Sequence, residues 1–382
     1  MQMSGPDCFS ALAAEGVLGL QPYVPGKPLA DLEREYGIRD SIKLASNENP
    51  LGPPPASVRA ISAALGDLAL YPDGAAFELK NALAERLAVK PAQITVGNGS
   101  NELLSLVAET FLTPATEAIY SQYAFLIYAL SVQATGATAR IAPANAADHA
   151  QPFGHDLAAM KRLLVSATRL VFIANPNNPT GTWLDAAELR AFIGSLPAHV
   201  LVVLDEAYVE YVAGHDWPDT VSWLDEFPNL IITRTFSKMY ALAGLRVGYA
   251  VSHPEVAELL NRVRQPFNVN SLAQIAARAA LDDAEHVTRS RQLNAEGLIQ
   301  LTTGLSALGW RVSPSAGNFV LADTGGAAQP WYEKLLRVGV IVRPVANYGL
   351  PNHLRITIGR PEQNERLLSA LNSLMAGKVP RA

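Results

Sequence analysis

The sequence has little of three features that would each indicate a particular class of protein. Cys8 is the only cysteine among 382 residues, which excludes a disulfide framework and a metal site built on several thiolates. The 30 basic and 35 acidic residues form no basic block, and the net charge of −5 argues against nucleic acid or an anionic membrane as the main partner. The purely apolar runs, such as residues 200–204, are far too short to cross a bilayer.

The start of the chain also lacks positive charge. It carries Asp7 and Glu15 and has no basic residue before Lys27. A secretory signal needs a positive start and then an unbroken apolar stretch, so we expect a soluble, cytoplasmic protein. Hydrophobic residues make up 49% of the chain, enough for a large core, and its length corresponds to two or three packed domains.

Short apolar runs followed by turn residues and then by helical patterns recur through the first two thirds of the chain. They predict strands at 93–97, 169–174, 200–204 and 230–233, with a helix near 185–195 and another over 102–112. The strands are apolar throughout, as expected where both faces of a sheet are covered. The pattern predicts an α/β fold whose large domain has three layers, a mostly parallel sheet between helices.

Composition divides the chain into three parts. Residues 1–45 are rich in glycine and proline and predict an irregular arm. Residues 46–265 carry the alternating strands and helices of the large domain. Residues 266–382 change to long helices, with strands near 317–322, 339–343 and 354–358, which predicts a smaller α+β domain joined by part of the arm.

Polar residues that can carry chemistry follow the predicted strands. In open parallel sheets, ligands bind outside the carboxyl ends of the strands. We therefore expect these residues to line one pocket: Ser100, Asn101, Asn178, Asp205, Tyr208, Ser237 and Lys238.

Lys238 lies in a stretch of mostly small and apolar residues, 233–250, where a lysine is unusual. An amine held in such a place can lose its proton and form a Schiff base with an aldehyde. Ser237 and Arg246 beside it can hold a phosphate. Pyridoxal phosphate is an aldehyde that carries a phosphate, and an ordinary surface lysine after a strand is the plain alternative.

Three further segments fit the same cofactor, each with a plainer alternative. Residues 97–102 offer free N–H groups for a phosphate at a helix start, or form an ordinary helix cap. Asp205 can pair with a protonated pyridine nitrogen and Tyr208 with the ring's phenolate oxygen, or the two can be a strand-end cap and a core aromatic. Asn178 can donate to the same oxygen, or belong to a plain turn.

The ordered set NPNNPTG, DEAY, SK and GLRVGY resembles the fold type I aminotransferases that use pyridoxal phosphate. The resemblance runs from residue 21 to residue 359. Within that superfamily, the segments PYVPGK, LASNENPLGP, LYPDG, SAGNFVLAD and LRITIG are similar to the histidinol-phosphate aminotransferase family.

The resemblance implies cofactor roles residue by residue. Lys238 corresponds to the lysine that binds the cofactor covalently, Asp205 to the partner of the ring nitrogen, and Asn178 and Tyr208 to the pair at the phenolate oxygen. Tyr123 corresponds to the tyrosine that stacks on the ring. Because the family more often has a proline-containing turn before that tyrosine, Tyr120 is the alternative. The phosphate positions correspond to Ser100, Asn101, Thr235, Ser237 and Arg246.

The resemblance also implies the substrate and the assembly. Tyr71 corresponds to a tyrosine supplied across a dimer interface, which implies a homodimer with shared sites. The substrate-binding positions correspond to Tyr23, Asn178, Arg343 and Arg355. The implied reaction passes an amino group from histidinol phosphate to 2-oxoglutarate in histidine biosynthesis.

Three other functions use related chemistry or the same fold. An aminotransferase for aromatic amino acids would relax the recognition of the side chain, and a lyase would decarboxylate a phosphorylated amino acid. A regulator would need a basic DNA-binding segment, and residues 1–45 have too little basic charge for one.

Overall fold

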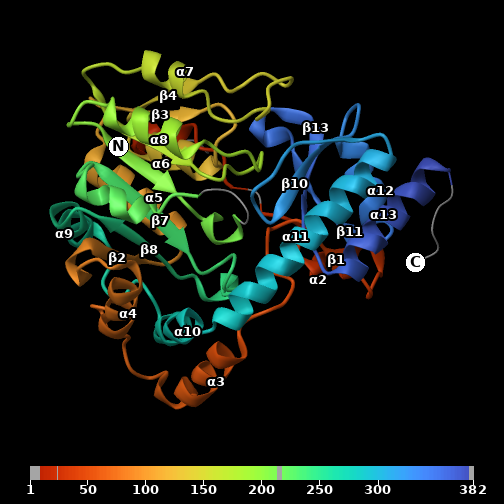
Figure 1. The fold of residues 1–382 in the computed structure, drawn as a ribbon, viewed down its shortest axis with the longest axis horizontal. Coiled ribbons are helices and arrows are strands. Elements are labelled where there is room, and N and C mark those ends of the chain that lie inside the picture. Colours follow the sequence, from red (N-terminus) through yellow and green to blue (C-terminus); the bar gives the residue numbers. More distant parts are fainter. Residues whose placement is uncertain (1–8, 24, 213–216, 378–382) are drawn as a thin grey trace.

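The computed structural model describes residues 9–23, 25–212 and 217–377, so Cys8 lies outside the described residues. Its larger sheet has seven strands in the order β2-β8-β7-β6-β5-β3-β4 (Figure 1). The pairs from β7 to β4 are parallel, and β8 is antiparallel to β2 and β7. The strands are β2 (Ile94–Gly97), β3 (Glu117–Ser121), β4 (Thr138–Ala142), β5 (Thr168–Ala174), β6 (Leu201–Asp205), β7 (Leu230–Thr235) and β8 (Gly248–Ser252).

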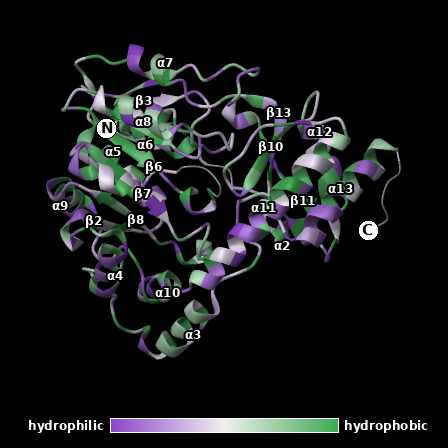
Figure 2. Ribbon diagram, in the orientation of Figure 1, coloured by the Kyte–Doolittle hydropathy of each residue, from purple (hydrophilic) through white to green (hydrophobic). Residues whose placement is uncertain are grey.

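Helices cover both faces of this sheet, which confirms the predicted three-layer α/β fold. Alternate residues of one strand enter two different cores, as Val202 and Leu204 do on one face and Val203 on the other. The central strands β5 and β6 are therefore mostly hydrophobic along their length (Figure 2). One face carries α4 (Phe77–Leu87), α7 (Leu157–Arg162), α8 (Ala186–Gly194) and α10 (Ser271–Leu281). The other carries α5 (Ser100–Phe111), α6 (Leu126–Ala134) and α9 (Pro254–Val263).

A second, antiparallel sheet has the strand order β12-β13-β10-β9. Its strands are β9 (Arg311–Val312), β10 (Phe319–Asp323), β12 (Arg343–Val345) and β13 (Leu350–Thr357). A parallel pair, β1 (Ile42–Lys43) and β11 (Val340–Ile341), lies beside it. The remaining α-helices are α1 (Glu15–Leu18), α2 (Leu29–Tyr36), α3 (Pro55–Ala64), α11 (Ala284–Ala307), α12 (Gln329–Leu336) and α13 (Pro361–Met375). None of the helices within the described ranges is long and apolar enough to cross a membrane.

The core on the α10 face of the large sheet meets the core of the second sheet along α11, the long helix that runs from the large sheet to the second one (Figure 1). Val287 near its start packs with the first core, and Leu301 and Leu305 near its end pack with the second. The predicted boundary at residue 265 comes before α10, whose buried face belongs to the first core. The division into three parts stays a prediction, and α10 packs with the large sheet.

Part of the predicted arm packs with the second sheet. Ile42 and Leu44 enter its core, and Leu32 of α2 packs with Ala45 and Leu336. Residues 45–47 then pass between the two sheets, with Ala45 and Asn47 buried and Ser46 half-buried. This segment therefore borders the carboxyl ends of the parallel strands.

Local sequence fixes where several helices begin. Asp156, Asp185, Asn270 and Asp283 precede α7, α8, α10 and α11, and each side chain accepts a hydrogen bond from a backbone N–H of the first turn. Proline stands at the start of α3, α9 and α13, where its missing N–H costs nothing.

Candidate active site

A cavity lies between the carboxyl ends of the large sheet's strands and the second sheet. Most of the predicted site residues line it: Tyr23, Ser100, Asn101, Asn178, Asp205, Tyr208, Thr235, Ser237, Lys238, Arg246, Arg343 and Arg355. They come from the arm, from loops after β2, β5, β6 and β7, and from β12 and β13. The fold therefore brings together residues that are more than 300 positions apart in the chain.

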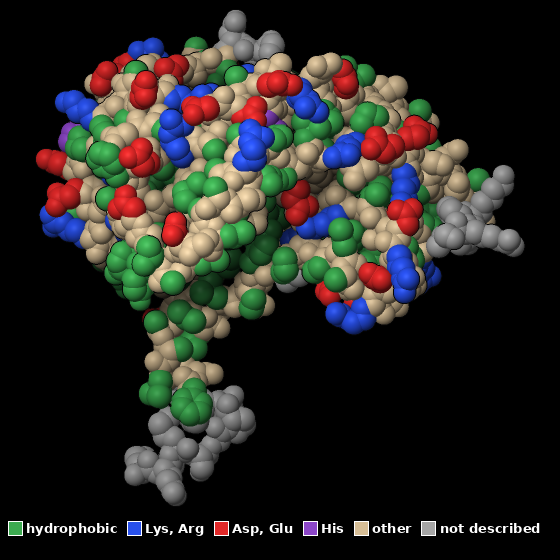
Figure 3. Space-filling view, turned by 90° about the horizontal axis from the view of Figure 1, so that it is seen from below, with side chains coloured by type: hydrophobic (Ala, Val, Ile, Leu, Met, Phe, Trp, Pro, Cys, Tyr) green, Lys and Arg blue, Asp and Glu red, His purple; other side chains and the backbone are tan. Residues whose placement is uncertain are grey.

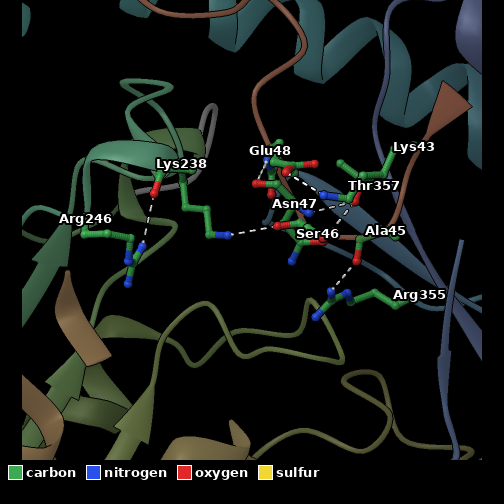
Figure 4. A network of polar contacts seen from close by, with 11 residues as sticks. Lys43, Ala45, Ser46, Asn47, Glu48, Lys238, Arg246, Arg355 and Thr357 are labelled. Atoms are coloured by element: carbon green, nitrogen blue, oxygen red, sulfur yellow. Dashed lines mark hydrogen bonds and ion pairs between the residues drawn. The ribbon is translucent and has the colours of Figure 1, made fainter. Parts of the chain in front are cut away.

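Lys238 follows β7 and extends its amine across the cavity. Its Nζ donates to the carbonyl oxygen of Ser46 at 3.1 Å (Figure 4) and lies 5.8 Å from the centre of the Tyr208 ring. Burial lowers the pKa of Lys238 to about 7, and the nearby positive charge of Arg355 adds to the effect. The amine is thus in part uncharged near neutral pH, as a nucleophile toward an aldehyde must be.

A corner of the cavity lies where α5 begins. Arg246 adopts a left-handed backbone conformation with φ of 57°, and its Nη1 lies 3.5 Å from Ser237 Oγ. A Cβ atom on Gly99 would lie 2.4 Å from Arg246 Nη2, and one on Gly248 would lie 2.7 Å from the Ser100 nitrogen. Only glycine permits this close approach. The corner combines a guanidinium, a hydroxyl and the free N–H groups of a helix start, which suits a phosphate.

Asp205 ends β6 with its carboxyl group buried. The Tyr128 hydroxyl donates to Asp205 Oδ2 at 2.8 Å, and the Thr233 hydroxyl and the Ala207 N–H donate to Oδ1, each at 3.3 Å. Burial raises the pKa of Asp205 to about 6 although these hydrogen bonds oppose it. A buried carboxyl group of this kind is well suited to bind a positively charged ring nitrogen. The positive charge would favour the ionised form of Asp205.

Arginines of the second sheet face the strand ends. Arg355 donates from Nη1 to Asn178 Oδ1 at 2.6 Å and from Nη2 to the Ala45 carbonyl at 2.8 Å, while its Nε has no hydrogen-bond partner. Arg343 lies over the ring of Tyr23 at 5.7 Å. The side of the cavity away from the sheet is thus positively charged and can bind an anionic substrate.

The predicted ring-stacking residue is not at the cavity. Tyr123 packs edge-on against Phe153, with ring centres 5.3 Å apart, and Tyr120 is buried in the core beneath α5 and α6. Phe125, two residues after Tyr123, lines the cavity instead. The turn after β3 directs Tyr123 toward the second sheet's side chains, and the aromatic residue in QYAF that meets the cavity is therefore Phe125.

Tyr71 lies away from the cavity, and two polar residues that were not predicted as site residues line it. Tyr71 is 82% exposed, stacks on Phe267 with ring centres 4.8 Å apart and does not line the cavity within this chain. Ser46 and Asn47 line the cavity but were not predicted as site residues. The only signal for them in the sequence is that their segment, LASNENPLGP, resembles one of the family. Nothing in the composition of this segment indicates that it lies between two sheets.

Comparison with known proteins shows both the class of enzyme and the family to which the chain belongs. A family model described as aminotransferase class I and II matches residues 39–371, so the chain is an aminotransferase of that class. It is 55% identical to histidinol-phosphate aminotransferase 1 of Nitrosococcus oceani over 367 residues, 96% of this chain and 98% of that protein. It is also 55% identical to histidinol-phosphate aminotransferase 2 of Pseudomonas aeruginosa, covering 96% of this chain and 99% of that one. The chain therefore belongs to the histidinol-phosphate aminotransferase family.

A solved structure agrees with this assignment. The crystal structure of histidinol-phosphate aminotransferase from Sinorhizobium meliloti, in complex with pyridoxal-5'-phosphate, superposes with a TM-score of 0.87. It is 30% identical in sequence, and the match covers 96% of this chain and 98% of that one. The predicted fold type is thereby confirmed.

The raised pKa of Asp205 predicts how stability depends on pH in protein prepared without cofactor. The carboxyl group ionises near pH 4 in the unfolded chain and near pH 6 in the folded one. Between these values the folded state binds more protons than the unfolded state, so the free energy of unfolding falls as pH rises. We expect Asp205→Asn to match the wild type at pH 4 and to be more stable above pH 6, by up to about 3 kcal/mol. Urea unfolding at pH 4 and pH 8 measures this, and an equal difference at both values would contradict the assignment.

Proposed function

We propose that the chain transfers the amino group of histidinol phosphate to 2-oxoglutarate, with pyridoxal phosphate as its cofactor, in histidine biosynthesis. The observation that carries the proposal is the cavity that joins Lys238, Asp205 and the phosphate-binding corner at Arg246. The relatives at 55% identity support it by name, and they favour neither an aromatic aminotransferase nor a decarboxylase. The relative from S. meliloti supports the choice of cofactor.

The residues present fit this cofactor. Gly99 and Gly248 leave room at the start of α5, where any Cβ atom would collide. Ser100, Asn101, Thr235, Ser237 and Arg246 are the residues that would hold the phosphate, through N–H groups, hydroxyls and the guanidinium. The corner therefore offers both the hydrogen bonds and the positive charge that a phosphate dianion needs.

When bound, pyridoxal phosphate supplies an aldehyde for the amino group and a protonated ring that accepts electrons as the substrate's α-proton leaves. Lys238 would hold the cofactor covalently and, once displaced, move the proton at the substrate's α-carbon as a general base and acid. Asp205 would hold the proton on the ring nitrogen. Asn178 and Tyr208 would bind the ring oxygen, and Phe125 would cover one face of the ring.

The substrate would bind between the cofactor and the second sheet. Arg355 has an Nε without a partner, and Arg343 and Tyr23 lie nearby at the same side of the cavity. Two arginines suit the dianionic phosphate of histidinol phosphate, and Arg355 suits the α-carboxylate of the acceptor in the other half-reaction. One positively charged region would thus serve both substrates.

A homodimer with shared sites is part of the same proposal. Tyr71 lies in a stretch of the chain with several exposed large hydrophobic side chains, which are Leu65, Leu68, Leu70, Tyr71 and Phe77. Hydrophobic side chains also gather on the underside of the molecule and along the arm that projects from it (Figure 3). Patches of this kind mark association surfaces, and a second copy would bring Tyr71 to its partner's cavity. The cytoplasmic location stays a prediction from the sequence.

Replacing Lys238 tests the proposed chemistry. We expect Lys238→Ala to abolish turnover of histidinol phosphate with 2-oxoglutarate, because no other amine lines the cavity among the described residues. Any cofactor that still binds should lack the yellow absorbance of the lysine-linked form. Turnover assays and absorbance spectra measure both effects, and a variant that transaminates at the wild-type rate would show the central assignment to be wrong.

Replacing Arg355 tests the proposed substrate. We expect Arg355→Ala to raise KM for histidinol phosphate by about 10-fold or more, the usual scale for the loss of a hydrogen bond to a charged group. Arg337→Ala, at an exposed position outside the cavity, is the matched control. Steady-state kinetics on both variants, with phenylalanine and tyrosine as competing donors, measure the effect. Equal KM values for the two variants would exclude Arg355 as a substrate-binding residue.

A further inference from the structure

The segment 45–47 is held from both sheets at once (Figure 4). Arg355 of β13 donates to the Ala45 carbonyl, and Lys238 of the large sheet donates to the Ser46 carbonyl. Asn318 donates from Nδ2 to the Asn47 carbonyl at 3.0 Å. The backbone of this segment is therefore fixed at the centre of the cavity.

Asn47 itself is buried and has a left-handed backbone, with φ of 56°. Asparagine is one of the few residues other than glycine that adopts this conformation readily. The conformation lets its side chain reach the large sheet while its N–H group reaches the second one. Thr357 on β13 and Tyr208 after β6 are its two side-chain partners.

The Asn47 amide has its oxygen at Thr357 and its NH₂ group at Tyr208. The Asn47 backbone N–H donates to Thr357 Oγ1 at 2.9 Å, so this oxygen is an acceptor there. The Thr357 hydroxyl then gives its own hydrogen to Asn47 Oδ1, at 3.1 Å. With the carbonyl side of the amide used in this way, the NH₂ side faces Tyr208.

The orientation of the Asn47 amide in turn fixes the direction of its hydrogen bond with the Tyr208 hydroxyl. Asn47 Nδ2 lies 2.8 Å from the Tyr208 hydroxyl oxygen, and an amide NH₂ can only donate. The Tyr208 oxygen therefore accepts, and its hydrogen remains free to donate into the cavity that both residues line. Burial raises the pKa of Tyr208 above its usual range, so the hydroxyl keeps this hydrogen.

We infer that Asn47 is a positioning residue that directs the hydroxyl hydrogen of Tyr208 toward the ring oxygen of the cofactor. The inference rests on the proposed function, because that oxygen belongs to the proposed cofactor. Asn47 acts through Tyr208 and does not touch the cofactor itself. Because Thr357 of β13 holds the Asn47 amide, the second sheet influences where the Tyr208 hydrogen points.

Asn47→Asp tests the inference because it changes the direction of one hydrogen bond while keeping the shape. Aspartate tolerates the same backbone conformation. Its carboxylate only accepts, so it would take the hydrogen of Tyr208 as well as that of Thr357. Tyr208 would then have no hydrogen to give to the ring oxygen.

The measurement is the pH midpoint of the yellow absorbance of the lysine-linked cofactor, with the dissociation constant of pyridoxal phosphate as a second readout. A hydrogen bond to the ring oxygen stabilises the more negative, unprotonated form of the link and so lowers the midpoint. We expect N47D to raise the midpoint by about 1 pH unit, a tenfold change in the proton equilibrium. We also expect it to weaken cofactor binding.

A double-mutant comparison separates this effect from the added negative charge. The carboxylate that N47D introduces would also raise the midpoint, next to the other charged groups around Lys238, which are Arg355, Glu48, Arg246 and Lys43. In a Tyr208→Phe background only the charge effect remains, so the shift caused by N47D should be clearly smaller there. Arg337→Ala, at an exposed position outside the cavity, should leave the midpoint unchanged.

Each outcome decides between the two proposals. A wild-type protein that shows no yellow absorbance with pyridoxal phosphate would overturn the proposed function itself. A wild type that binds the cofactor, combined with equal N47D shifts in both backgrounds or with no shift, would overturn the role of Asn47 alone. If N47D does not retain cofactor, N47A takes its place, with a smaller shift expected in the wild-type background and none in Y208F.

Discussion

Lys238 holds its amine in a cavity where burial, together with the charge of Arg355, lowers its pKa to about 7. That environment exists only because two sheets face each other across the segment 45–47, whose Ser46 carbonyl receives the amine. The large sheet supplies the lysine, and the second sheet supplies the arginine that disfavours its protonation. The reactivity that we assign to Lys238 is thus a property of the packing between the sheets.

The same packing explains how other groups in the cavity are held. Parallel strands end at one edge, so Asp205 and the loop that carries Lys238 lie side by side, since β6 and β7 are neighbours. Glycine at positions 99 and 248 lets Arg246 and the start of α5 approach closely at the corner where we propose that the phosphate binds. Asn47 connects the two sheets by hydrogen bonds to the Tyr208 hydroxyl and to Thr357 of β13. Each of these contacts depends on backbone geometry as much as on residue type.

Much of this arrangement could be predicted from the sequence. Uniformly apolar strands indicated a sheet covered on both faces, and polar residues after those strands indicated a pocket at their carboxyl ends. The sequence could not show which aromatic residue of the turn after β3 faces the cavity, because one or two residues of loop conformation decide between Tyr123 and Phe125. It could not show the burial of Asn47, which depends on contacts with Thr357 and Tyr208, 310 and 161 positions away in the chain.

The central claim is that Lys238 forms a covalent bond with pyridoxal phosphate, and chemical trapping tests it most directly. Borohydride reduction of the protein with bound cofactor, followed by proteolysis and mass spectrometry, identifies the modified residue. We predict that the mass of the reduced cofactor lies on the peptide that contains Lys238, at close to one cofactor per chain. Modification of a different lysine, or none at all, would contradict the account.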